Sequence, residues 1–178
     1  MLSIIVMLVV NLIGMTLYAQ KAQQQISNST NKDISNTHHQ DKNTIGTYIG
    51  EQTITPLASA IMIQPFGVHR DLVYHIKVFH SSIILRPTKD TDVRAVFDAK
   101  VLFAAKKNGF GYVVILEHAN QLRSIYVGLD HIEPTIKKGV LLKKASKIGE
   151  VSHELRFQVV QDGKYIDPVS FFLQNTYR

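Results

Sequence analysis

Three polar side chains that can do acid–base or binding chemistry alternate along one short segment near the C-terminus. Glu154, Arg156 and Gln158 occupy every second position, and apolar residues lie between them. This period of two is typical of a β-strand with one polar and one apolar face, on which alternate residues are about 6.6 Å apart. His80 and His153 are candidate partners, because together with Glu154 they could form an acid–base set for hydrolysis.

The elements that must position these residues are predicted to be strands. Val73–Phe79 and Arg123–Val127 are rich in β-branched and aromatic residues, which favour strands. Val113–Leu116 is a short continuous apolar run, and it predicts a strand buried on both faces. We therefore expect a mostly β domain with an antiparallel sheet.

Turn and helix signals separate these segments. Lys107–Gly109, Lys138–Gly139 and Asp162–Gly163 each combine a turn-forming residue with glycine, which predicts turns between the strands. Pro168 follows Asp167 and is well placed at the first position of one short helix. The sequence shows no long helical period between the strands.

The same region contains a series of short motifs that resembles the lysostaphin/LytM-type peptidoglycan endopeptidases, whose domain is of the duplicated hybrid motif type. The motifs are His80–Ile84, Val93–Val101, Gly109–His118, Tyr126–Leu129, Ile136–Gly139, Lys147–Val151, Glu154–Gln158 and Asp162–Pro168. They follow the family order H-x-G-[hydrophobic]-D, V-x-A-x-x-x-G-x-V, G-x-G-x-x-V-x-I-x-H, Y-x-H-L, a Lys/Gly turn, I-G-x-V, H-L-H-F-E and D-G-x-x-x-D-P. The resemblance covers about 110 residues (single-domain size) and implies an antiparallel β-sheet domain of that type.

The resemblance also implies where zinc would be held, and those positions have changed. His80 matches the first ligand, but Ile84 stands at the aspartate position and Arg156 at the last histidine. The positions that assist the bound water are Glu154 and Gly128. Catalytic zinc needs three protein ligands, whereas isoleucine has no lone pair and guanidinium has no acceptor. We expect a degenerate domain without bound zinc, other cofactor or catalytic residue.

Neighbouring histidines are poor substitutes for the lost ligands. His131 lies three residues after Gly128, and His153 lies three residues before Arg156. An odd offset places a strand residue on the opposite face, unless a bulge re-aims it. We interpret both as surface or turn histidines, and we expect His118 to cap a strand end rather than to bind metal.

A metal-free groove is the remaining candidate site. The resemblance places His80, Tyr126, Gly128, Glu154, Arg156 and Gln158 along it as binding residues. Arg156 can pair with Glu154 and so fill the vacated ligand position, or it can grip a carboxylate of a ligand in two-pronged fashion. Both alternatives remain open from the sequence.

The chain before the predicted domain has two further parts. Residues 1–19 are almost wholly apolar and are interpreted as a signal peptide or a membrane anchor. Residues 20–52 are rich in Gln, Asn, Ser, Thr and Lys, a composition typical of a disordered polar linker. The β domain is then expected at 53–178. Export to the periplasm, either as a released protein or as one anchored in the membrane through residues 1–19, follows from this arrangement.

Charge and cysteine content exclude some classes. The formal net charge is +6, and there is no cysteine, so neither a lipid-modified cysteine nor a disulfide framework is possible. Lysines gather at Lys106–Lys107, Lys137–Lys138, Lys143–Lys144 and Lys147. They indicate either attraction to an anionic partner or protection of edge hairpins. No nucleic-acid-binding motif is present.

The resemblance and the lost ligands together suggest a non-catalytic cell-envelope protein. Family members without zinc ligands resemble regulators or activators of peptidoglycan hydrolases, or scaffold adaptors of the envelope. The expected partner is then an envelope protein such as a peptidoglycan amidase, or peptidoglycan itself. Two alternatives remain: a peptidoglycan- or peptide-binding module, and a divergent zinc endopeptidase.

Overall fold

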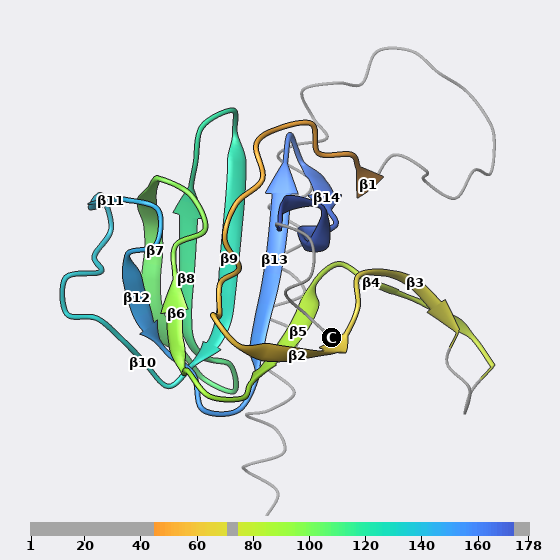
Figure 1. Cartoon of the computed structure of the whole chain (residues 1–178), viewed down its shortest axis with the longest axis horizontal. Helices are drawn as coiled ribbons and strands as arrows, with labels where there is room; N and C mark the ends of the chain where they lie inside the picture. The colour runs from red at the N-terminus through yellow and green to blue at the C-terminus, as the bar shows by residue number, and fades with distance from the viewer. Residues whose placement is uncertain (1–44, 71–74, 173–178) are drawn as a thin grey trace, which may run out of the picture. The chain divides into compact units, whose positions relative to one another are not determined.

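The computed structural model describes residues 45–70 and 75–172, which belong to one compact unit, Asp41–Arg178 (Figure 1). Their regular structure is almost entirely β, as predicted. The strands are β1 (Ile45–Gly46), β2 (Ala60–Gln64), β3 (Gly67–Arg70), β4 (Lys77–His80), β5 (Ile83–Pro87), β6 (Asp92–Arg94), β7 (Ala99–Lys107), β8 (Gly111–Glu117), β9 (Leu122–Leu129), β10 (His131–Ile132), β11 (Leu141–Leu142), β12 (Lys147–Glu150), β13 (Leu155–Gln161) and β14 (Lys164–Ile166). One 3-10 helix, η1 (Pro168–Phe171), follows β14.

Three sheets share these strands. The main sheet has nine strands, with β1-β14-β13-β9-β8-β7-β11 in order; β5 pairs with β13, and β2 pairs with β5. A small sheet, β10-β12-β6, lies in front of the main sheet in Figure 1, and the β3–β4 hairpin extends away from it. All the pairings are antiparallel except that of β1 with β14.

The apolar core is built by the period-two alternation of the strands. On β13, Leu155, Phe157 and Val159 are buried, while Arg156 is exposed. One cluster of buried side chains joins them to Val93 of β6 and to residues of β12. Removing this apolar surface from water is the main stabilisation of the domain.

Two strand predictions need correction. Val73–Phe79 was expected as one strand, but β4 begins only at Lys77, and residues 73–74 lie outside the described residues. The run Val113–Leu116 was expected to be buried on both faces. Val114 and Leu116 are buried, whereas Val113 and Ile115 are only half-buried because they lie on the outer face of the main sheet.

The predicted turns and the predicted helix are present. Asp162 and Gly163 both have positive φ, 50° and 75°, and they form a two-residue connection between β13 and β14. This conformation suits the Asp-Gly pair. Pro168 begins η1, and the carboxylate of Asp167 accepts a hydrogen bond from the Val169 amide at 3.0 Å.

The structure differs from the linker prediction at its C-terminal end. β1 pairs with β14, and the ring of Tyr48 lies 4.0 Å from that of Phe171 between centroids. The part of the expected linker at 45–52 therefore packs on the β domain. The remainder of the linker and the apolar segment 1–19 lie outside the described residues. Within 45–70 and 75–172, no helix has the length and apolar character needed to span a bilayer.

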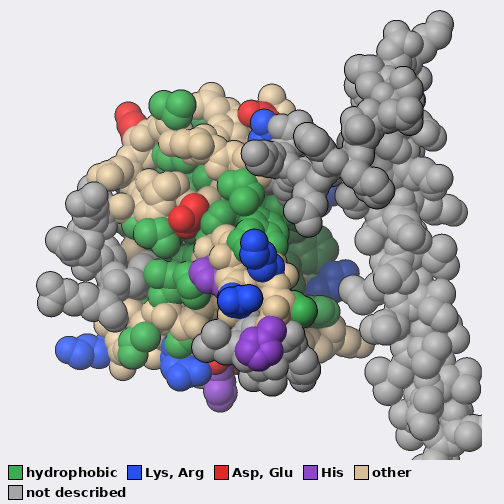
Figure 2. Space-filling model, turned by 90° about the vertical axis from the view of Figure 1, so that its right-hand side faces the viewer, with side chains coloured by type: hydrophobic (Ala, Val, Ile, Leu, Met, Phe, Trp, Pro, Cys, Tyr) green, Lys and Arg blue, Asp and Glu red, His purple; other side chains and the backbone are tan. Residues whose placement is uncertain are grey.

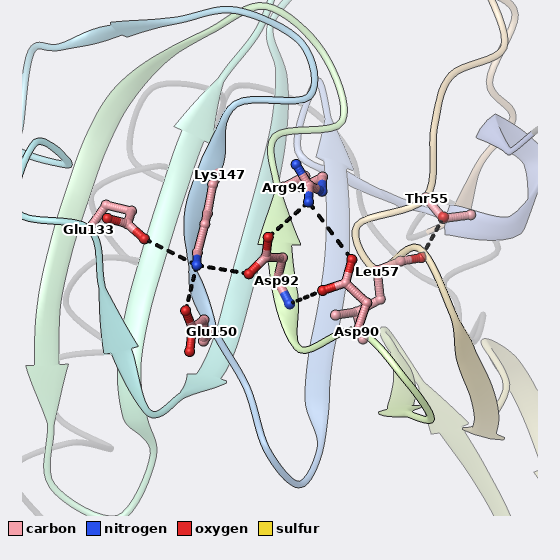
Figure 3. Close-up of polar contacts among 8 residues, drawn as sticks. All are labelled: Thr55, Leu57, Asp90, Asp92, Arg94, Glu133, Lys147 and Glu150. Atoms are coloured by element: carbon pink, nitrogen blue, oxygen red, sulfur yellow. Dashed lines mark hydrogen bonds and ion pairs between the residues drawn. The ribbon is translucent and has the colours of Figure 1, made fainter.

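A cluster of charges ties the small sheet together (Figure 3). The ammonium of Lys147 on β12 lies 2.8 Å from Asp92 of β6 and 3.5 Å from Glu133, and it also contacts Glu150. Arg94 binds Asp92 from the other side at 2.8 Å. The hydrogen bonds to Asp92 and Glu150 raise the pKa of Lys147 above its usual value. Lys147 therefore holds three carboxylates together across the small sheet and its flanking loop.

We predict that Lys147→Met lowers the midpoint of thermal unfolding, because Asp92, Glu133 and Glu150 then repel one another without a cation between them. This loss of stability should be smaller in 1 M salt, because the Debye screening length is then only about 3 Å. Circular dichroism melts measure both effects. Lys143→Met is the matched control, since Lys143 makes one ion pair and its side chain is 87% exposed. Equal melting of the two variants would contradict the role of Lys147.

Candidate functional site

Two of the positions that the resemblance assigns to zinc lie side by side on the main sheet. Arg156 of β13 is directly opposite Ile84 of β5 and, on its other side, Val127 of β9. Residues opposite one another on antiparallel strands have Cβ atoms about 4.5–5.5 Å apart on the same face. The backbone therefore still brings the two former ligand positions together.

The side chains at these positions do not fit zinc. Isoleucine offers no lone pair, and guanidinium donates from all its nitrogens and accepts at none. His80 is then the single donor among the three positions, whereas catalytic zinc takes three. Elsewhere in 45–70 and 75–172, no three His, Asp or Glu side chains are grouped so that they could hold a metal ion.

The guanidinium of Arg156 faces solvent. Glu154, its expected partner, instead forms an ion pair with Arg86 of β5 at 2.8 Å. No other described residue forms an ion pair with Arg156. The interpretation that Arg156 fills the vacated position through a salt bridge to Glu154 is therefore wrong. The register explains this, because Arg86 continues β5 beyond Ile84 on the same face and so reaches Glu154 first.

His80 ends β4, and its ring contacts Pro65 and His69 of β3. Its Nδ1 donates to the carbonyl of Pro65 at 3.3 Å, and the ring stacks on His69 at 5.1 Å. The hydroxyl of the next residue, Ser81, accepts a hydrogen bond from the side-chain amide of Gln158 at 2.8 Å. Gln158 therefore links the end of β4 to β13. The sequence did not indicate that His69 contacts His80. The two rings are brought together by the pairing of β3 with β4, which no motif in the sequence marks.

Tyr126 was expected in the groove, and that prediction is wrong. It lies opposite Phe157 on the core side of β9 and is 0% exposed. Its hydroxyl accepts a hydrogen bond from the Val96 amide at 3.2 Å, and burial raises its pKa to about 12. The groove face of β9 is formed instead by Ile125 and Val127, opposite Gln158 and Arg156.

Gly128 follows an irregularity in the sheet that explains this error. The pairing of β8 with β9 shifts between Tyr112 and Val113, which leaves Gly128 without a partner. Its φ is +101°, and a Cβ built on it would lie 2.6 Å from the carbonyl oxygen of Glu154. Side chains are therefore disfavoured here by conformation and by contact. Because of this bulge, Tyr126 and Gly128 do not share a face as a regular strand would require.

The two histidines weighed as substitute ligands lie away from Arg156. His131 belongs to β10 of the small sheet, and its Nε2 is 3.7 Å from Glu150. His153 is exposed in the segment that leads into β13. Their interpretation as surface or turn histidines is confirmed by their exposure.

His118 has the structural role that the sequence indicated. It follows β8, its Nδ1 donates to the Asp98 carbonyl at 2.9 Å, and its Nε2 lies 2.7 Å from the hydroxyl of Ser124. This pair has the composition of a hydrolase nucleophile and base. However, Ser124 is 1% exposed, so the hydroxyl is closed to a substrate. With a carbonyl at Nδ1, the neutral ring accepts from Ser124.

A pocket that the sequence did not reveal adjoins His118. It has a volume of about 520 Å³ and is lined by residues that include Tyr48, Phe97, Asp98 and Lys144. The pocket lies where β8 ends and β9 begins, because the paired residues Leu122 and Gln161 also line it. Gly128 is near the other end of β9. Its far wall comes from 48–52, which the sequence analysis had assigned to the linker.

We predict that the environment of His118 makes folding weaker in mild acid. Burial lowers the pKa of His118 below 6.5 in the folded protein. The unfolded chain therefore binds a proton more readily, so the stability is complete above pH 6.5 and falls as the pH drops towards the folded value. Its slope reaches at most about 1.4 kcal/mol per pH unit. Urea unfolding between pH 7.5 and 5.0 measures it.

In that experiment, His118→Asn should be less stable at pH 7.5 but flatter with pH, since it keeps one donor for Asp98 and loses the titrating ring. His131→Asn, the same substitution at a histidine whose side chain is 54% exposed, is the control. A wild-type slope that survives in His118→Asn would assign the effect to another group.

We also predict that Gly128→Ala destabilises the domain by about 1–3 kcal/mol, the cost of a strained left-handed residue. The close contact of the new Cβ with the Glu154 carbonyl oxygen adds to this cost. Gly139→Ala is the matched control: its φ is +92°, but a Cβ there meets nothing within 4 Å. Urea unfolding of the two variants separates strain from contact. Equal losses would show that the Glu154 carbonyl gives way.

Comparison with known proteins agrees with this geometry. The profile of Peptidase family M23 matches residues 78–168. The DD-carboxypeptidase/endopeptidase Mpg of Neisseria meningitidis is 27% identical over 128 residues, which are 70% of this chain and 30% of that protein. The chain thus spans about a third of the length of the curated relatives that it matches.

Solved structures share the fold. Csd3 of Helicobacter pylori superposes with a TM-score of 0.62 at 25% identity, over 72% of this chain and 37% of that one. A chain of the SpoIIIAH–SpoIIQ complex gives a TM-score of 0.57 at 22% identity, over 68% of this chain and 100% of that one. With the profile match over more than half of its residues, the chain belongs to Peptidase family M23.

Proposed function

We propose that this protein is a non-catalytic M23-family protein of the cell envelope that regulates or activates peptidoglycan hydrolases, or acts as a scaffold adaptor for envelope proteins. The observation that carries the proposal is the pairing of Ile84 with Arg156 at two former ligand positions. The family backbone is kept there, and zinc chemistry has no donors. A domain of this kind contributes through binding.

The face of the main sheet around Arg156, where the sequence predicted a groove, has the properties of a binding surface. Half-buried Ile84 and Val127 flank Arg156 on the neighbouring strands, and its guanidinium forms no ion pair with a described residue. Arg is enriched in protein interfaces, where it combines apolar contact with directed hydrogen bonds. The Arg86–Glu154 pair at one end and the Gln158–Ser81 hydrogen bond at the other fix the neighbouring side chains.

The comparisons support a protein partner. A chain with the same fold is found in the SpoIIIAH–SpoIIQ complex, so the fold is used for assembly with another protein. A peptidoglycan amidase or another envelope protein is the proposed partner. Export through residues 1–19, as a signal peptide or an anchor, places the domain in the periplasm in this proposal.

A peptidoglycan- or peptide-binding module is the second candidate, and the open guanidinium of Arg156 favours it. Arg forms two-pronged hydrogen bonds with carboxylates, and a free peptide carboxylate would match the groove. Sedimentation with insoluble cell wall, without any amidase, separates this function from the first: binding that needs no protein partner favours the module.

We predict that residues 41–178 neither bind stoichiometric zinc nor release soluble fragments from peptidoglycan. The double substitution Ile84→Asp/Arg156→His should gain zinc affinity, because it supplies two donors beside His80. Calorimetry with zinc and a muropeptide digest measure the two properties. Ile84→Asn/Arg156→Gln is the control, with similar size and weaker ligands. Stoichiometric zinc on the wild type, or fragment release, would restore the endopeptidase alternative.

The double variant should bind zinc and remain inactive. Of the two positions that would assist the bound water, Glu154 is paired with Arg86, and at Gly128 the backbone excludes a side chain. A pull-down from envelope extract tests the binding role with the same domain. Arg156→Glu should lose the partner, while Arg123→Glu, an exposed arginine nearer the far end of β9, should retain it.

A further inference from the structure

We propose that the β11 edge of the main sheet binds the surface of an anionic lipid bilayer, with Leu141 entering the interface between headgroups and acyl chains. This basic edge consists of Lys100, Lys137, Lys138, Lys143, Lys144 and Leu141. It is separate from the Arg156 groove and goes beyond the proposed function. The inference rests on charge, exposure and backbone order at this edge.

Lysine is the predominant charge of the basic edge, although Glu117 lies opposite Lys100 and Asp98 contacts Lys143. From Pro134 to Gly149 the chain has five lysines and no acidic residue. Lys147 turns into the carboxylate cluster of the small sheet (Figure 3), and the other four remain exposed. Lys143 contacts Asp98 at 2.9 Å, yet its side chain is 87% exposed. Lysine near an anionic bilayer contributes about 1 kcal/mol of attraction.

The backbone holds these lysines in place. The amide of Gly139 donates to the carbonyl of Val101 at 2.8 Å, and the amide of Val101 donates to the carbonyl of Val140 at 2.9 Å. The buried side chain of Ile136 anchors the loop before β11. After β11, the amide of Lys144 donates to the Asp98 carboxylate at 2.8 Å. The edge is thus ordered before it meets a partner, which lowers the entropy cost of binding.

Leu141 selects a bilayer over a soluble polyanion. It is 78% exposed and lies opposite Lys100, while the next residue, Leu142, lies opposite the buried Ala99. Lysines on an edge strand can serve only to prevent aggregation, but that role does not call for an exposed leucine among them. An exposed apolar side chain opposite Lys100 and near Lys143 fits the interface of an anionic bilayer, where the lysine heads remain in water.

The position of the edge allows this contact. In the order of the main sheet, β11 and β1 are at opposite ends (Figure 1). The space-filling view from the right-hand side of Figure 1 shows a mixed surface of apolar, cationic and histidine side chains (Figure 2). β1 itself therefore does not cover the basic edge.

The absence of cysteine makes a specific test possible in the full chain. Leu141→Cys and, separately, Lys164→Cys on β14 carry a small environment-sensitive fluorophore. Vesicles of phosphatidylcholine with 30% phosphatidylglycerol are compared with pure phosphatidylcholine. We expect a blue shift and quenching by lipid-borne quenchers at position 141 with anionic vesicles only, and neither at position 164. Because each label reports its own surroundings, membrane insertion of residues 1–19 does not imitate the result.

Charge variants complete the test. Adding Lys137→Gln/Lys138→Gln to the labelled chain should weaken insertion about 25-fold, because each lysine contributes about fivefold. Lys89→Gln/Lys164→Gln, with the same change in charge elsewhere, should alter it less than twofold. An unshifted label at 141 with anionic vesicles would overturn the proposal. So would an equal response to soluble polyglutamate, which would make the edge a polyanion site. Neither outcome bears on the absence of zinc chemistry at Arg156.

Discussion

The alternation of side chains along β13 is the constraint on which both the core and the groove depend. Leu155, Phe157 and Val159 must face the apolar core, where Phe157 packs against Tyr126 and Phe172. The intervening residues must then point to the opposite face of the sheet. A shift of one residue in register would bury Arg156 and expose Phe157. The core thus fixes the place of the guanidinium, whatever it binds.

The same constraint explains which parts of the fold the sequence predicts. The apolar alternation identified β13 and its polar face, and the Asp162–Gly163 pair identified the turn that follows it. β1 was missed because two residues in a polar tract carry no periodic signal. Its order comes from pairing with β14 and from the contact of Tyr48 with Phe171. These are tertiary contacts, which local sequence does not encode.

The site could be predicted only in part, for related reasons. The loss of zinc donors at Ile84 and Arg156 follows from residue identity alone, and cross-strand pairing confirms that the two positions adjoin. The ion pair of Glu154 with Arg86 depends on the register of β5 against β13. Arg86 belongs to none of the family motifs, so the sequence did not identify it as the partner. The face of Tyr126 depends on the bulge at Gly128. One unpaired residue reverses the alternation of side chains beyond it. The prediction that Tyr126 and Gly128 share a face assumed a regular strand and therefore failed.

The substitutions at the former ligand positions are also physically consistent with one another. A carboxylate and an imidazole brought together by the sheet would need an ion or other partners to offset the desolvation of the carboxylate. Ile84 is β-branched, suits a strand, and buries part of its surface between β2 and β13. Arg156 can lay its apolar stem beside Ile84 and Val127 while its charged end remains in water. The groove is therefore stable without a metal, and its remaining directional chemistry is that of a guanidinium, which donates hydrogen bonds and cannot activate water.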